Sequence, residues 1–133
     1  KLFEALKKQE PDRPIFFVSG EVKTLVREEI RELTEKSENA IIVASYGTYS
    51  TGINIRNLHN IIFAHPSKSR IRNLQSVGRG LRKSYGKKNA TLFDLSDDLS
   101  WKKHKNFSLK HFVERIKIYN SEKFNYTLRS IKL

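Results

Sequence analysis

The chain has 133 residues, which is enough for one domain with a hydrophobic core. It contains no cysteine, so disulfides and thiolate metal sites are excluded, and an intracellular, cytoplasmic location is the expectation. No apolar run is long enough to cross a membrane, and the N-terminus lacks the apolar core of a signal peptide. The chain does not start with methionine, so we expect it to be a piece of a longer protein.

The formal net charge of +12 is unevenly distributed. Residues 1–38 hold eight basic and nine acidic side chains, whereas residues 39–93 hold nine Lys or Arg and no Asp or Glu. A central third without acids predicts binding to a polyanion, either nucleic acid or nucleotide. The alternative is a solvated basic face that keeps the domain soluble.

The first half of the chain is predicted to alternate helices and strands. An N-terminal helix ends at Pro11, and the apolar runs 15–18 and 40–44 are typical of buried strands. Between these strands, an amphipathic helix is predicted over 22–36. Its apolar positions are Val22, Leu25, Val26, Ile30 and Leu33. Two strands joined through a helix by short connections imply a parallel pair with a right-handed crossover.

The second half continues this pattern. Further strands are predicted at 60–64 and 90–94, a basic helix at 68–78, and a last helix from about 108. The sequence leaves open whether the last helix breaks near Asn125 or continues to the end. The apolar positions of the last helix are Leu109, Phe112, Val113, Ile116 and Tyr119. The fold class is therefore α/β, with one parallel sheet covered by helices on both faces.

Ligands bind such sheets at the carboxyl ends of the strands, so the loops there are the candidate site. The loops are Ser19-Gly20, Ser45 to Asn54, His65 to Lys68, and the segment from Asp94. The second loop is rich in glycine and hydroxyl residues, which suits phosphate binding, and Tyr46 and Tyr49 are available to stack on a base or sugar. The alternative is an ordinary loop whose hydroxyls cap the backbone.

A second candidate site is the stretch Gln75-Ser76-Val77-Gly78-Arg79-Gly80-Leu81-Arg82. Arg79 and Arg82 are three residues apart, so on a helical turn they share a face and can grip one polyphosphate. The glycines beside them leave room for close backbone approach. This stretch is predicted to be a phosphate clamp.

The loop Ala44-Ser-Tyr-Gly-Thr-Tyr-Ser-Thr-Gly-Ile-Asn54 and the clamp stretch resemble motifs V and VI of the second RecA-like domain of superfamily two helicases and translocases. The resemblance covers essentially the full chain, 1–133, with a helical extension from about 101. The amino-acid sequence as a whole, through residues 122–126, is most similar to phage recombination helicases. This resemblance implies branched DNA substrates: junctions, stalled forks and RNA–DNA hybrids. Such domains usually begin with a strand, so the sheet is expected to lack its first strand.

The resemblance also implies roles for single residues. Arg82 would be the arginine finger on the γ-phosphate of ATP, Arg79 would assist it, and Gln75 would couple nucleotide state to geometry. Gly52 and Asn54 would lie near the nucleotide. The residues implied to lie along the nucleic-acid backbone are Ser45, Tyr46, Ser19, Gly20 and Arg27.

Neither a phosphate loop of the form Gly-x-x-x-x-Gly-Lys-Ser/Thr nor an acidic box for magnesium is present. ATP and Mg²⁺ would therefore be bound mainly by the first RecA-like domain of the same parent chain, and this chain alone is expected to be inactive. No metal ligands are predicted, and the spacing of the four histidines matches no paired metal site. The acidic cluster of Asp94, Asp97 and Asp98 is expected to cap a turn or a helix start.

One basic-aromatic patch, Trp101-Lys-Lys-His-Lys105, has two interpretations: contact with a nucleic-acid strand, or a tryptophan packed under a loop beside solvated lysines. Three functions stay open for the chain as a whole. The leading hypothesis is half of an ATP-driven DNA motor. The second is a non-enzymatic basic module that binds nucleic acid or docks on a separate ATPase subunit, and the third is a translocase of the restriction or chromatin-remodelling type.

Overall fold

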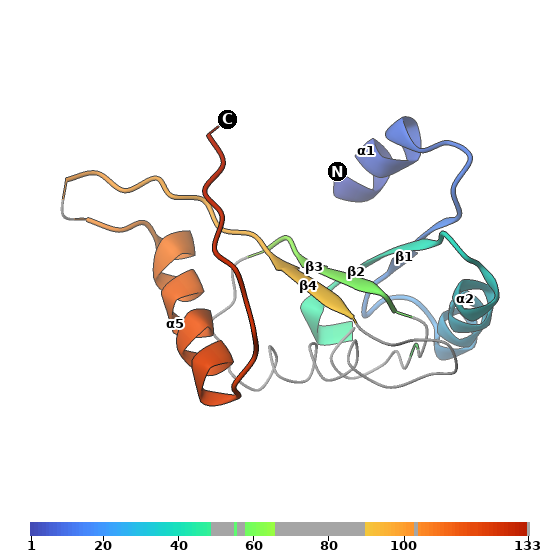
Figure 1. Ribbon diagram of the computed structural model, residues 1–133. Helices are drawn as coiled ribbons and strands as arrows, with labels where there is room; N and C mark the ends of the chain where they lie inside the picture. Colours follow the sequence, from blue (N-terminus) through green and yellow to red (C-terminus); the bar gives the residue numbers. More distant parts are fainter. Residues whose placement is uncertain (49–54, 56–57, 66–89, 103, 133) are drawn as a thin grey trace.

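The computed structural model describes residues 1–48, 55, 58–65, 90–102 and 104–132 (Figure 1). The predicted basic helix and the phosphate clamp lie outside these described residues. Elements in chain order are α1 (Leu2–Gln9), β1 (Ile15–Val18), α2 (Thr24–Lys36), β2 (Ile41–Ala44), β3 (Asn60–Phe63), β4 (Thr91–Asp94) and α5 (Phe107–Ser121). Each of them corresponds to an element predicted from the sequence.

The open question about the last helix is settled by its C-terminus. Helix α5 ends at Ser121, and no helix follows among residues 122–132. Lys123 adopts a positive φ of 57°, and the Phe124 N–H donates to the Tyr119 carbonyl at 2.9 Å. A residue in this left-handed conformation closes a helix and satisfies its last carbonyls.

Strands β1 and β2 form a parallel ladder in which Ile15 lies opposite Ile41 and Val18 opposite Ala44. The crossover between them contains α2, as the sequence predicts. A small apolar core lies here, made of Val18, Ile30 and Ile55 with Phe16, Ile42, Ala44 and Leu58 packed against it. On the other side, α1 packs on β1, and the ring centroids of Phe3 and Phe17 lie 5.6 Å apart.

The buried face of α2 differs from the predicted apolar face. Ile30 is buried, but Leu25 is 80% exposed and Leu33 is 52% exposed. The second buried position is Thr34. Its hydroxyl donates to the Ile30 carbonyl at 2.7 Å, so the buried polar group has a hydrogen-bond partner within the helix. Positions 30 and 34 lie one turn apart, and Leu25 points more than a quarter turn away from them. The predicted apolar face was therefore wrong for Leu25, Val26 and Leu33, which are all exposed.

Strands β3 and β4 form a second parallel ladder, in which Phe63 lies opposite Asp94. Helix α5 buries Arg115, Ile118 and Tyr119. Figure 1 shows α2 and α5 at opposite ends of the molecule, with the strands between them.

The strands do not form the single continuous sheet predicted from the sequence. Within the described residues, they form two ladders of two strands each. The ladders are joined by side chains, since the rings of Tyr46 and Phe63 lie 5.5 Å apart. None of the helices in the described part is long and apolar enough to cross a membrane.

Candidate functional site at the carboxyl ends of the strands

The carboxyl ends of all four strands meet in two adjoining pairs. Val18 pairs with Ala44, and Phe63 pairs with Asp94, so the segments that follow these residues emerge side by side within each ladder. The Ser45 N–H donates to the Val18 carbonyl at 3.2 Å and continues the first ladder by one bond. We call this region, formed by Ser19, Gly20, Ser45, Tyr46, His65 and Asp94, the carboxyl edge.

The loop after β1 is held by an arginine from the first turn of α2. Arg27 donates from Nε to the Val22 carbonyl at 2.7 Å and from Nη2 to the Gly20 carbonyl at 3.0 Å. These bonds use two of the five guanidinium N–H donors. A Cβ added at Gly20 would meet no atom within 4 Å, so the backbone there is open to close approach. The structure therefore places Arg27 against the Ser19-Gly20 loop, and the predicted contact of these residues with nucleic acid stays a prediction.

The segment after β2 begins with a helical turn rather than with the loop predicted from its composition. Residues 46–48 are helical, and Ser45 is the residue before them. Its Oγ lies 2.8 Å from the Thr48 Oγ1 and accepts a hydrogen bond from the Thr48 N–H at 3.4 Å. This is the geometry of a serine N-cap, in which the side chain satisfies an exposed N–H of the first turn. The loop prediction was wrong for residues 46–48, and the Ser45 hydroxyl already has a structural partner.

Tyr46 connects the two ladders. Its hydroxyl donates to the His65 carbonyl at 3.0 Å, and its ring packs on Phe63 and lies 6.5 Å from the His65 ring. Burial raises the pKa of Tyr46 to about 12; the charge of Arg115 lowers it by a smaller amount, and the charge of Asp94 raises it. The tyrosine side chain is thus engaged between the strand ends.

A buried polar network lies directly behind the end of β4. Arg115 donates to both carboxylate oxygens of Asp94, from Nε at 2.7 Å and from Nη2 at 2.6 Å. The Tyr119 hydroxyl donates to the same carboxylate at 2.7 Å. The Arg115 side chain is fully buried, and that of Asp94 is 9% exposed. Burial lowers the pKa of Arg115, but the hydrogen bond and charge of Asp94 outweigh this and raise it overall.

The sequence did not predict this network; it predicted that Asp94 caps a turn or a helix start. That expectation was wrong for Asp94, which instead fixes α5 to β4. It is confirmed for Asp98, whose Oδ1 accepts hydrogen bonds from the N–H and hydroxyl of Ser100. A signal was available: Arg115 stands three residues after Phe112 and four before Tyr119, so it lies on the apolar face of its helix.

The predicted nucleotide contacts lie outside the described residues. They are Gln75, Arg79, Arg82, Gly52 and Asn54. Among the residues that the structure does describe, no group of three His, Asp or Glu side chains could hold a metal ion.

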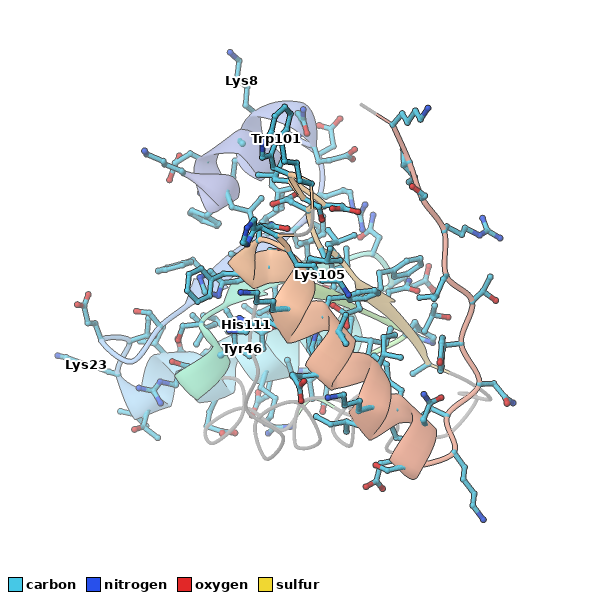
Figure 2. All side chains as sticks on the ribbon, turned by 90° about the vertical axis from the view of Figure 1, so that its left-hand side faces the viewer. Lys8, Lys23, Tyr46, Trp101, Lys105 and His111 are labelled. Carbon is cyan, nitrogen blue, oxygen red and sulfur yellow. The ribbon has the colours of Figure 1, made fainter. Side chains whose placement is uncertain are left out.

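The basic-aromatic patch lies between β4 and α5, apart from the carboxyl edge. Trp101 is 73% exposed, so the interpretation that it is packed under a loop is wrong. Figure 2 shows Trp101 and Tyr46 well separated in the molecule.

No protein-family model matches the chain. Its fold is similar to the C-terminal part of the Fun30 ATPase domain, with a TM-score of 0.61 and 15% identity over 90% of this chain and 44% of that one. The fold is therefore that of the C-terminal, RecA-like part of an ATPase domain.

In sequence, the chain is homologous to the ATP-dependent DNA helicase UvsW of Enterobacteria phage T4, with 44% identity over 138 residues. The match covers 96% of this chain and 27% of the length of that helicase. The resemblance to superfamily two helicases that the motifs indicate is thereby confirmed.

Proposed function

We propose that this chain is the C-terminal half of an ATP-dependent DNA helicase or translocase that remodels branched DNA, meaning junctions, stalled forks and RNA–DNA hybrids. The observation that carries the proposal is the 44% identity to a DNA helicase over nearly the whole chain. The acid-free stretch from 39 to 93 supports it, because basic residues without neighbouring acids favour binding to a phosphate-rich ligand. In this proposal, residues 1–133 belong to the second RecA-like domain, with a helical extension from about residue 101.

On the nucleotide side, Arg82 is the arginine finger, Arg79 assists it, and Gln75 couples the nucleotide state to the cleft. Gly52 and Asn54 lie beside the nucleotide. ATP and Mg²⁺ are bound mainly by the first RecA-like domain of the parent chain. The chemistry that ATP supplies is phosphoryl transfer to water, and these residues stabilise the charge that develops in it. The chain by itself is then inactive as an ATPase.

On the DNA side, the proposed track consists of the Ser19-Gly20 loop with Arg27 and the start of the helical turn at Ser45 and Tyr46. Arg27 donates hydrogen bonds to two loop carbonyls, which stabilises one conformation of the loop before DNA binds. Because the side chains of Ser45 and Tyr46 have partners inside the domain, their contacts to DNA phosphates are made by the backbone.

The test is the substitution Arg82→Ala in the longer protein that contains this domain. DNA-stimulated ATP hydrolysis should fall by about a thousandfold or more, with DNA binding largely kept, because an arginine finger acts on the transition state. Arg129→Ala, at an exposed position in the C-terminal segment, is the matched control and should leave turnover unchanged. Unchanged ATP hydrolysis by Arg82→Ala would contradict the assignment of Arg82 as the arginine finger. A parent protein that binds DNA but hydrolyses no ATP would favour the non-enzymatic module instead.

A further inference from the structure

The segment from Leu95 to Asn106, which we call the arm, runs out beyond the strands and turns back into α5 (Figure 1). Its two sides are tied together by one side chain. Asn106 accepts from the Leu99 N–H at 3.3 Å and donates to the Asp97 carbonyl at 3.0 Å. Closer to the strands, the Ser96 and Ser108 hydroxyls lie 3.1 Å apart. Hydrogen bonds between its two sides therefore stabilise the conformation of the arm.

Trp101 stands at the turn of the arm. The Trp101 N–H donates to the His104 carbonyl at 3.0 Å, and the His104 N–H donates back to the Trp101 carbonyl at 2.9 Å. Lys102 adopts a positive φ of 52°, which makes the tight reversal. These bonds fix the backbone that bears the indole, although 73% of the residue is exposed. Leaving so large an apolar ring in water is unfavourable, which points to a partner that covers it.

The charges around the ring indicate the chemistry of that partner. Lys102 and Lys105 follow Trp101 by one and four residues in the sequence, and both are exposed. The acids of the arm are Asp97 and Asp98, and the Asp98 carboxylate is already bound by Ser100. Lysine is depleted at the core of protein–protein interfaces, whereas an aromatic ring beside cations is the usual platform for an unpaired base and its phosphates.

We propose that Trp101 stacks on an unpaired base of single-stranded DNA, with Lys102 and Lys105 contacting the adjacent phosphates. The inference rests on the proposed function, since it names a second DNA contact outside the carboxyl edge. It commits to a single strand because the bases of an intact duplex are stacked on one another and present no face to the indole.

The chain is suited to a direct test, because Trp101 is its single tryptophan. An oligothymidine of about 12 nucleotides, within the usual site size for such proteins, is titrated into the 133-residue chain at low salt. Tryptophan fluorescence should be quenched as the strand binds. By anisotropy of a labelled oligothymidine, Trp101→Ala should bind about tenfold more weakly, which is within the range for loss of one stacked base.

Two variants make the result specific. Trp101→Phe keeps an aromatic face and should retain most of the affinity. Leu99→Ala is the matched control, since Leu99 is 75% exposed on the same arm but has no ring, and it should bind like the unsubstituted chain.

The outcomes separate this inference from the proposed function. If the chain binds DNA with a steep dependence on salt, but Trp101→Ala binds equally well, the stacking inference is overturned and the DNA function stands. Tryptophan fluorescence that stays constant at saturating DNA also overturns it and points to a protein that covers the ring. If no variant binds DNA at low salt, the DNA part of the proposed function fails as well.

Discussion

The two ladders of this domain are stabilised by different forces. Around β1, α2 and β2, the interior is apolar and is centred on Val18, Ile30 and Ile55. Around β4 and α5, the most deeply buried side chain is an arginine paired with Asp94 and supported by Tyr119. An apolar core is non-directional and tolerates small shifts, whereas a bidentate ion pair fixes both distance and angle. The second half is therefore built to hold α5, and with it the arm, in one orientation.

The largest effect is expected from breaking the polar half. Arg115→Ala leaves the Asp94 carboxylate buried with Tyr119 as its remaining described partner, and removing one member of a buried pair costs about 3–5 kcal/mol. The free energy of unfolding, measured by urea titration, should fall by about this amount. The matched control is Arg31→Ala on helix α2.

Arg31 also forms ion pairs, with Glu28 at 2.7 Å and Glu35 at 3.1 Å, but these lie on the surface of α2. Surface pairs contribute about 0–1 kcal/mol, so Arg31→Ala should change the free energy of unfolding little. Equal losses for the two arginines would mean that burial of the Asp94–Arg115 pair does not distinguish the second half.

The next largest effect is expected in the apolar half. Ile30→Ala removes buried methylenes from a core of few residues and should lower the free energy of unfolding by about 2–3 kcal/mol, the lower part of the range for such truncations. Leu25→Ala, on the same helix, removes a side chain that is 80% exposed and should cost less than about 0.5 kcal/mol. A larger loss from Leu25→Ala would show that the apolar face predicted from the sequence covers the domain after all.

The contrast between Ile30 and Leu25 shows how far the sequence predicts this structure. Apolar runs and proline positions locate the helices and strands, because hydrophobic periodicity and helix ends are local properties. The direction in which α2 faces the sheet is decided by long-range packing. Thr34 is buried there in place of Leu33, since its hydroxyl bonds to its own helix.

The same limit applies to the candidate site. Parallel strands place the segments after Val18 and Ala44 at one edge, so the sequence predicts that Ser19 and Ser45 follow neighbouring strand ends. It did not predict that the Ser45 hydroxyl caps a helical turn or that Tyr46 bonds across to His65, 19 residues away. Partners so distant in the chain have no signature in the local pattern, and the 21-residue separation of Asp94 and Arg115 has the same consequence.

The smallest effect is expected at Tyr46, where the two halves meet, and it depends on pH. Loss of its hydrogen bond to His65 in Tyr46→Phe should cost about 1 kcal/mol at neutral pH. Burial raises the pKa of Tyr46 to about 12 in the folded chain, whereas an unfolded tyrosine loses its proton near 10. Between these values the unfolded state binds fewer protons than the folded state, so the stability that Tyr46 contributes falls as pH rises.

Urea unfolding of both proteins at about pH 8 and about pH 11, on either side of the ordinary tyrosine pKa, tests this prediction. The advantage of the unsubstituted chain over Tyr46→Phe should be full at the lower pH and should shrink at the higher pH. Subtracting the two proteins cancels the titration of every group they share. An advantage that stays constant would mean that Tyr46 is not buried between the strand ends. The two ladders would then be joined by something other than this ring.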